Sequence, residues 1–354
     1  MYFSDDIKNV HLEPSSLCNA RCPICPRYAM GGEKNNTFVE RAISLNEFKS
    51  WFSPKFINQL NSIIMCGNFG DPCTTPDLVD IVYYIQEHNP TISLKITTNG
   101  GMRNLRFWED LGNAIKDNKD AAVVFSIDGL RDTNHIYRRG VDWNKLESNI
   151  KTFRSTGAKA RWEFLVFKHN EHQIEEAEQL SKDWGFRDIR FKWNPFGFTS
   201  NRNTTLVYDK DGNFEYEIFK RGVSNAQIKS LPELQIQKSS DMIYIAPEEM
   251  PNQYIELQST NISCQSQRLN EIYVSSIGQV YPCCFLSAIW HYKNKHWEDI
   301  QFIDLIKEHY DELNLNNSDL DTILASDFFH KKIVNGFKKG NDRTIHCSKW
   351  CGVK

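Results

Sequence analysis

The sequence predicts an α/β protein, an open partial (β/α)6 barrel similar to a TIM barrel, followed by a small α+β carboxyl-terminal domain. Between about residues 8 and 195, short β-branched or apolar runs alternate with amphipathic helical stretches, the pattern of parallel βα units. The alternation is lost after Pro195, and short strands return near residue 271. With 354 residues, the chain is long enough for two units. We expect a barrel, an unassigned bridging segment and a smaller domain at residues 1–195, 196–253 and 254–354.

Six stretches have the composition of strands in this barrel. They are residues 9–13, 62–66, 93–97, 122–127, 161–167 and 189–193. The helices between them carry start signals: Ser44 and Glu47 form a capping box, and Asp142 can cap a later helix. Six such units favour an open, partial barrel over the closed barrel of eight units.

Composition and charge argue against several classes of protein. The formal net charge is −3 and no block of five like charges occurs, so electrostatics offer no support for nucleic acid as a partner. No apolar stretch approaches the ~18 residues of a membrane span, and the amino terminus has no apolar signal region. We therefore expect a soluble, cytoplasmic protein without a membrane partner.

The chain contains ten cysteines, and they are clustered. Three lie between residues 18 and 25, two flank a glycine-rich turn near residue 70, and five lie in the last quarter of the chain. Because the cytosol keeps thiols reduced, such clusters are better interpreted as metal ligands or reactive thiols than as disulfides.

The first cluster is Cys18, Cys22 and Cys25, with the spacing C-x3-C-x2-C directly after the first predicted strand. Thiolates are the usual ligands of iron–sulfur clusters. A four-iron cluster held by three thiolates leaves one iron open, as a catalytic zinc site keeps one position open for substrate. Zinc is the alternative, but structural zinc sites need four ligands, typically in paired C-x2-4-C spacings.

This loop resembles the signature of the radical S-adenosylmethionine (SAM) superfamily, although Ile24 stands where the family usually has an aromatic residue. The resemblance implies that the open iron of a 4Fe-4S cluster binds the amino and carboxylate groups of SAM. An electron from a low-potential donor, such as flavodoxin or ferredoxin, then cleaves SAM. The resulting 5′-deoxyadenosyl radical abstracts a hydrogen atom from the substrate.

The second predicted strand ends in a glycine-rich turn, residues 67–72, which we call the glycine turn. Glycine lets the backbone approach a ligand closely. The turn resembles a variant of the family's Gly-Gly-Glu-Pro motif, which binds the SAM amino group. The candidate contacts to SAM are Gly67, Asn68, Gly70 and Asp71. A plain βα turn is the alternative.

Polar residues follow the next predicted strands, and the carboxyl ends of barrel strands are where reacting groups gather. The resemblance implies contacts to the ribose or carboxylate of SAM here, and an arginine that pairs with the carboxylate. The candidates are Thr98, Asn99, Ser126, Asp128 and Arg138, with Leu165 and Trp193 as contacts to the adenine. Turn, surface and core roles are the alternatives.

Two further thiols flank the glycine turn. Cys66 is interpreted as a buried core thiol, whereas Cys73 lies close to the expected mouth of the barrel. We consider Cys73 as a catalytic residue that donates a hydrogen atom to a substrate radical. The alternative is that neither thiol has a catalytic part.

The carboxyl-terminal cysteines Cys264, Cys283, Cys347 and Cys351 come from three separate segments. Four thiolates can fully ligate one cluster. The C-x13-G-x4-C spacing resembles the first half of the SPASM/twitch domain of radical SAM enzymes, without its central cysteine-rich run. This implies one auxiliary 4Fe-4S cluster. A structural zinc is the alternative, and Cys284 is the spare thiol because only Cys283 fits the spacing.

We therefore expect a radical SAM enzyme with a twitch-type auxiliary cluster, whose substrate is a peptide or a small molecule. A fully ligated auxiliary cluster can carry an electron away from a substrate radical, which favours peptide or protein modification or a net oxidation. One alternative is a radical SAM dehydrogenase of a small alcohol or sugar. Another is a non-catalytic iron–sulfur or zinc protein, which would not bind SAM.

Overall fold

The computed structural model describes residues 3–193, 203–224, 257, 259–290, 303–339 and 343–353. Its core is a curved sheet in which six parallel strands follow one another in chain order. These strands are β1 (Asn9–Leu12), β2 (Ser62–Met65), β3 (Ser93–Thr98), β4 (Ala122–Ser126), β5 (Ala160–Leu165) and β6 (Asp188–Lys192). Each lies within two residues of its predicted bounds, and the predicted partial barrel is confirmed.

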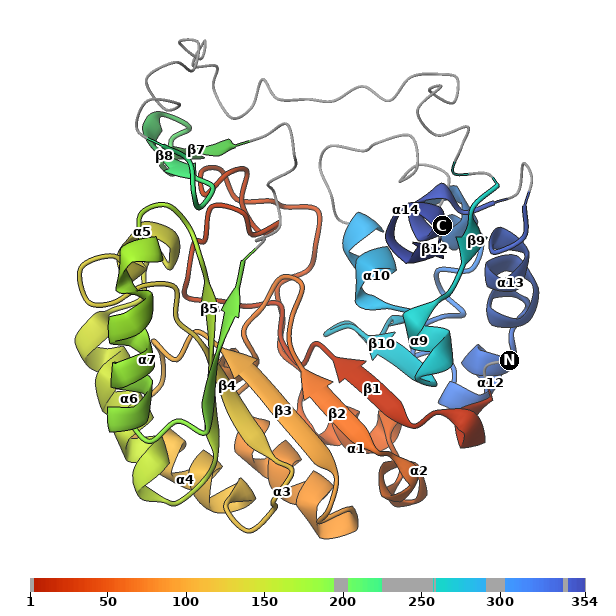
Figure 1. Ribbon diagram of the computed structural model, residues 1–354. Helices are drawn as coiled ribbons and strands as arrows, with labels where there is room; N and C mark the ends of the chain where they lie inside the picture. The colour runs from red at the N-terminus through yellow and green to blue at the C-terminus, as the bar shows by residue number, and fades with distance from the viewer. Residues whose placement is uncertain are drawn as a thin grey trace.

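Helices cover the outer face of this sheet (Figure 1). They are α1 (Leu45–Trp51), α2 (Pro54–Gln59), α3 (Leu78–His88), α4 (Leu105–Ile115), α5 (Asn134–Tyr137), α6 (Trp143–Ser155) and α7 (Ile174–Asp183). The predicted capping box is present, since Ser44 and Glu47 bond each other's backbone amides. Asp142 caps α6 by accepting a hydrogen bond from the amide of Lys145. These local signals fix where helices begin.

Alternate strand residues face the helices and form the apolar core. On β2 and β3, for example, Ile63, Met65, Leu94 and Ile96 are fully or almost fully buried. Successive side chains on a strand point to opposite faces, so the residues between them line the concave side of the barrel. Trp108 on α4 packs against Phe125 on β4 in the same core.

Two further strands from the carboxyl-terminal region extend the barrel sheet. The strand β10 (Glu271–Val274) pairs with β1 in parallel, with Glu271 opposite Asn9, and β11 (Val280–Tyr281) pairs antiparallel with β10. We had assigned this hairpin to the smaller unit, and the structure shows that it also belongs to the barrel sheet. The domain bounds remain a prediction.

A hairpin of β7 (Thr204–Tyr208) and β8 (Phe214–Phe219) occupies the described part of the bridging segment. Figure 1 shows it beside the loop that follows β1. The amide of Tyr208 donates to the carbonyl of Met30 at 3.1 Å, and Arg139 Nη1 donates to the Tyr208 carbonyl at 2.8 Å. The hairpin thus covers the segment after the first cysteines. The rest of residues 196–253 lies outside the described residues.

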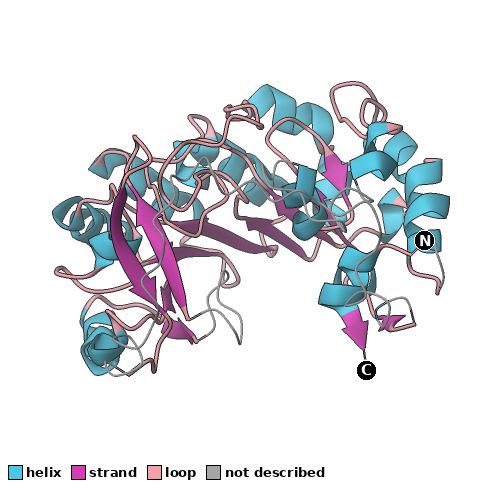
Figure 2. Ribbon diagram, turned by 90° about the horizontal axis from the view of Figure 1, so that it is seen from above, coloured by secondary structure: helices cyan, strands magenta, loops and turns pink. Residues whose placement is uncertain are grey.

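The carboxyl-terminal region is small and mixed in structure. Its elements are β9 (Asn261–Ile262), α9 (Gln265–Arg268), α10 (Cys284–Trp290), α12 (Leu320–Ala325), a π-helical turn (Phe328–Lys332), α13 (Ile333–Gly336), α14 (Ile345–Cys351) and β12 (Gly352–Val353). Seen from above, both marked chain ends lie on the same side of the molecule (Figure 2). Among the described helices, none has the length and apolar character that crossing a membrane requires.

Candidate active site

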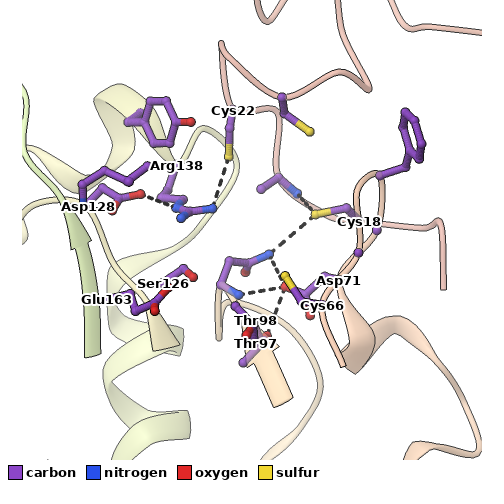
Figure 3. A pocket seen from close by; sticks show the side chains of 18 of the residues that line it. Cys18, Cys22, Cys66, Asp71, Thr97, Thr98, Ser126, Asp128, Arg138 and Glu163 are labelled. Atoms are coloured by element: carbon purple, nitrogen blue, oxygen red, sulfur yellow. Dashed lines mark hydrogen bonds and ion pairs between the residues drawn. The ribbon is translucent and has the colours of Figure 1, made fainter. Parts of the chain in front are cut away.

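A cavity of about 300 Å³ opens at the carboxyl ends of the barrel strands, and we call it the strand-end cavity. Figure 3 shows side chains from distant parts of the chain pointing into it. Most of the predicted site residues line it, namely Cys18, Cys22, Cys25, Gly67, Asn68, Gly70, Asp71, Thr98, Asn99, Ser126, Asp128, Arg138 and Leu165. The structure thus brings these residues together, while the role of each one remains a prediction.

The three thiols of the cysteine loop, Cys18, Cys22 and Cys25, lie along one wall of this cavity. Asn99 Nδ2 lies 3.7 Å from Cys18 Sγ, and Arg138 Nη1 lies 3.7 Å from Cys22 Sγ. Burial raises the pKa of Cys25 to about 12, so its thiolate needs a positive partner. A bound iron supplies such a charge.

The donor set fits an iron–sulfur cluster with one open iron. No group of three or more His, Cys, Asp or Glu side chains is placed to hold a metal ion within the part of the chain that is described. In a 4Fe-4S cluster each thiolate binds a different iron, so the ligands surround a volume instead of meeting at one point. Three thiols along one wall of a cavity suit this arrangement.

The glycine turn is packed tightly against the cysteine loop. A Cβ at Gly70 would lie 1.7 Å from the carbonyl oxygen of Ser15, and a Cβ at Gly67 would lie 2.5 Å from the carbonyl oxygen of Gly70. Neither position has room for a larger residue unless the backbone moves. Glycine at position 70 therefore lets the turn lie against the backbone that leads into the cysteine loop, and glycine at position 67 lets the turn fold back on itself.

Glu13 holds the glycine turn in place, and the sequence analysis missed it. Its side chain is 2% exposed, and Oε1 accepts hydrogen bonds from the amides of Phe69 at 2.7 Å and Gly70 at 3.0 Å. The hydroxyl of Tyr273, on β10, donates to Oε2. Burial raises the pKa of Glu13, and its three hydrogen bonds oppose the shift. Its position directly after a buried strand is the sequence feature that could have identified Glu13 as a site residue.

Asp71 has a different environment from the one expected of a ligand contact. Its carboxylate accepts hydrogen bonds from the amide of Cys73 at 3.0 Å and the hydroxyl of Thr98 at 3.1 Å. It also accepts from the amide and the side chain of Asn99, both at 2.8 Å. Asp71 lines the cavity, but these bonds mainly tie the end of β2 to the end of β3.

Asp128 and Arg138 form an ion pair at the opposite wall, with Nε 2.6 Å from Oδ2 (Figure 3). The amide of Leu165 donates to the other carboxylate oxygen at 2.6 Å. Burial works against the charge of Arg138, but the negative Asp128 beside it raises the pKa of the guanidinium. A permanently charged guanidinium, 18% exposed, therefore faces the cavity beside Cys22.

Two predicted site residues lie elsewhere. Cys73 is fully buried behind Asp71 and is not among the residues that line the cavity. Trp193 is 43% exposed, and its ring lies 5.0 Å from the guanidinium carbon of Arg221, also outside the cavity lining. Of the two thiols that flank the glycine turn, Cys66 is the one that lines the cavity. Other lining residues that the sequence analysis missed are Ala20, Phe69, Thr97, Tyr137, Glu163 and Lys192.

The carboxyl-terminal cysteines approach one another although they come from separate segments. The pairing of β9 with β12 brings Ser263 to Cys351, whose carbonyl accepts its amide at 2.9 Å. Burial raises the pKa of Cys347, and the nearby Cys264 and Cys351 raise it further. Burial also raises the pKa of Cys283, and Cys347 and Cys264 raise it further. These four thiols therefore share one neighbourhood.

Cys284 has other neighbours. Burial raises its pKa to about 12, and the next contributions come from Cys66 and Glu271, both on the barrel side. Its carbonyl accepts a hydrogen bond from Asn68 Nδ2 in the glycine turn at 2.8 Å. The assignment of Cys283, and not Cys284, to the carboxyl-terminal set remains a prediction.

A comparison with family models assigns part of the chain to a family. Residues 12–181 match the model of the Radical SAM superfamily. The match includes the cysteine loop, the glycine turn and the carboxyl ends of β1 to β5. Residues 12–181 thus form a radical SAM domain, and such a domain implies an enzyme that uses SAM and a 4Fe-4S cluster. A search of curated proteins found no match.

Solved structures share the fold at low sequence identity. SuiB of Streptococcus suis, in its structure bound to the precursor peptide SuiA, has a TM-score of 0.53 and 15% identity, over 92% of this chain and 66% of SuiB. The protein anSMEcpe with bound AdoMet has a TM-score of 0.50 and 16% identity, over 92% and 79%. The chain spans 60–66% of the SuiB chains that it matches. Both likenesses extend beyond the barrel into the carboxyl-terminal unit, as predicted for a barrel followed by an auxiliary domain.

Proposed function

We propose that this enzyme modifies a peptide or protein by abstracting a hydrogen atom with a radical derived from SAM. The observation that carries the proposal is the strand-end cavity. It combines the three thiols of the cysteine loop, the glycine turn and the Asp128–Arg138 pair in one space. When bound, the 4Fe-4S cluster supplies the electron that cleaves SAM.

Different residues of the strand-end cavity bind different parts of SAM and the cluster. Cys18, Cys22 and Cys25 hold the cluster, and the Arg138 guanidinium beside Cys22 offers a charged partner for a carboxylate. The glycine turn brings its backbone to the cavity wall without side chains in the way. The hydroxyl of Ser126, also in the lining, is suited to a ribose hydroxyl.

The carboxyl-terminal cysteines support the choice of an oxidative modification. Cys264, Cys283, Cys347 and Cys351 supply four thiolates, which can hold an auxiliary 4Fe-4S cluster with no open iron. Such a cluster has no room for a substrate ligand and would accept an electron from the substrate radical. The peptide substrate is proposed by analogy with the SuiB structure that holds its precursor peptide.

The first experiment tests SAM cleavage in anaerobically reconstituted protein. Wild type and Cys22→Ala are reduced with dithionite and supplied with SAM, and 5′-deoxyadenosine is quantified. We expect the product from wild type alone. Cleavage that is absent from wild type despite a loaded, reducible cluster would favour a non-catalytic iron–sulfur protein.

A second experiment tests the substrate class. Candidate peptides, and small alcohols or sugars as the alternative, are added to the same reaction, and the mass of each is measured afterwards. A peptide that loses two hydrogen atoms, or gains a cross-link, while 5′-deoxyadenosine accumulates supports peptide modification. Oxidation of an alcohol with no reaction of any peptide would replace this proposal by a small-molecule dehydrogenase.

A further inference from the structure

A second cavity, of about 360 Å³, lies on the concave side of the barrel and opens to solvent at β6, and we call it the lumen chamber. It lies on the inner face of β1 to β6, and residues of α9 and β10 complete its wall. Polar and charged side chains make up most of its lining, together with the thiol of Cys66. The SAM-binding role proposed for the strand-end cavity does not account for this space.

The lining of the chamber differs from the interior of a closed barrel. In a closed (β/α)8 barrel, layers of branched apolar side chains fill the interior. Here many inward positions of the strands carry charge. The charged residues that line the chamber are Lys95, Arg161, Glu163, Asp188, Arg190, Lys192 and Glu271. A cavity with this lining is suited to binding a polar ligand, and not to being filled by apolar side chains.

The positive charges of the chamber are only partly neutralised. Arg161 pairs with Asp188 at 2.9 Å, and Lys192 pairs with Glu163 at 2.6 Å. Lys95 and Arg190, on β3 and β6, form no ion pair or hydrogen bond through their side chains with any residue in the described ranges. A cationic side chain facing a cavity without an internal partner is complementary to an anion, and arginine is especially suited to carboxylate and phosphate.

The chamber adjoins the strand-end cavity. Cys66, Thr97, Glu163 and Lys192 line both spaces, and the first three are labelled in Figure 3. A ligand that occupies the chamber therefore lies next to the space assigned to SAM. That is the position a substrate needs for hydrogen abstraction, because the reacting atoms must come within about 3–3.5 Å of each other.

We propose that the lumen chamber binds an anionic group of the substrate, a carboxylate or a phosphate, through Lys95 and Arg190. The inference rests on the proposed function for its link to hydrogen abstraction. In a peptide, the group is an acidic side chain or the terminal carboxylate. The chamber thereby anchors one end of the substrate while its reacting carbon lies toward SAM.

Cys66 provides a reporter of the charge in the chamber that needs no SAM chemistry. Holoenzyme is treated with two methanethiosulfonate reagents of similar size, one carrying a sulfonate and one a trimethylammonium group. The rate of modification at each cysteine is measured by peptide-resolved mass spectrometry. It is divided by the rate at which the same reagent reacts with free 2-mercaptoethanol, which corrects for the intrinsic reactivity of each reagent. The ratio of the sulfonate rate to the trimethylammonium rate at Cys66 reports the local electrostatic potential.

The expected results concern changes in this ratio. Lys95→Gln and Arg190→Gln should each lower it about threefold, and the double variant should lower it further, because each removes a positive charge from the chamber that Cys66 lines. Arg106→Gln is the matched control: it removes an exposed arginine on α4, outside both cavities, and should leave the ratio unchanged. Lys95→Met replaces Lys95→Gln if that variant does not fold.

A competition experiment identifies the anion. Glutarate, inorganic phosphate and the neutral analogue glutaramide are added in turn, and the anions should slow the modification of Cys66 where glutaramide does not. Protection by glutarate alone assigns a carboxylate, and protection by phosphate alone assigns a phosphate. The proposal is overturned if the double variant keeps the wild-type ratio or if neither anion protects Cys66. Because this readout is independent of SAM cleavage, its failure is distinguishable from failure of the proposed function.

Discussion

The two groups of cysteines are assembled in different ways. Cys18, Cys22 and Cys25 lie on one loop, at the end of a strand whose position is fixed by its neighbours in the sheet. The carboxyl-terminal cysteines come from α14, the start of α9 and the turn before α10, and they meet through pairings such as β9 with β12. The first group depends on local sequence, and the second depends on long-range folding.

The two regions are also joined by a buried chain of contacts. Glu13 accepts hydrogen bonds from the glycine turn and from Tyr273 on β10, and Asn68 donates to the carbonyl of Cys284. The carboxyl-terminal region thus supports the loop proposed to bind SAM. The two cysteine groups can therefore have separate chemical roles although one set of contacts positions both regions. The following variants test this, from the largest expected effect to the smallest.

Replacing a thiol of the cysteine loop should have the largest effect. In Cys25→Ser, SAM cleavage should fall at least ~100-fold, because even the loss of a residue that only orients a metal ligand costs about 10–100-fold. The measurement is 5′-deoxyadenosine formed per chain, together with the iron content. Near-normal cleavage by a folded Cys25→Ser protein would contradict the assignment of this ligand.

Replacing a predicted carboxyl-terminal ligand should impair substrate modification more than SAM cleavage. Cys347→Ser should lower iron from about eight to about four atoms per chain, if each site holds a four-iron cluster. Modified substrate should fall far more than 5′-deoxyadenosine, because the electron acceptor is lost while the cysteine loop is intact. Iron analysis and both products decide the outcome. An unchanged iron content would argue for a different metal or none at the carboxyl-terminal site.

The contact between the regions is tested by Glu13→Gln. A neutral acceptor bonds the amides of Phe69 and Gly70 more weakly than a carboxylate does, so we expect the KM for SAM to rise about tenfold, equivalent to ~1.4 kcal/mol, with a smaller change in kcat. Initial rates of SAM cleavage give both constants. A lower Tm with an unchanged KM would indicate that Glu13 stabilises the fold without positioning the turn.

Tyr273→Phe should have a weaker effect of the same kind, because it removes one of the three donors to Glu13. We expect about a fivefold rise in the KM for SAM, equivalent to the loss of one hydrogen bond of ~1 kcal/mol. Tyr281→Phe is the matched control, since it removes a buried hydroxyl from the adjacent strand β11. Equal effects of the two variants would show that Tyr273 acts only through packing.

Cys284→Ser should have the smallest effect. Cys66 and Glu271 raise the pKa of this thiol in addition to burial, and the C-x13-G-x4-C spacing selects Cys283 as the ligand, so the iron content of Cys284→Ser should match wild type. Cys283→Ser is its partner variant and should lose iron as Cys347→Ser does. If the two variants exchange these outcomes, the ligand assignment of the adjacent pair is reversed.

Much of the barrel could be predicted because its signals are local. The strands alternate regularly with helices, and the caps at Ser44 and Asp142 were recognised from neighbouring residues. The parallel pairing of β10 with β1 was not predictable in this way. An alternating pattern reveals that a segment is a strand, but it does not identify a partner strand more than 250 residues away.

The site was predicted in part for the same reason. Residues directly after strands were placed correctly at the cavity because parallel strands end at one edge of the sheet. The charged residues of the lumen chamber were missed, since Lys95 and Glu163 alternate with apolar residues as they would on a solvent-facing surface. Cys73 was misplaced because sequence distance from the turn does not show that its side chain points into the core.

The pairing of β1 with β10 also has a consequence for how the protein folds. Glu13 and Tyr273 are 260 residues apart, so their contact must await synthesis of most of the chain. During synthesis the six βα units can form first. At that stage the hydrogen bond from Tyr273 to Glu13, which holds the glycine turn, is not yet made, and β1 remains an open edge of the sheet. Completing the sheet is therefore a late, long-range step of the kind that slows folding. We expect the chain to gain its full affinity for SAM only after that step.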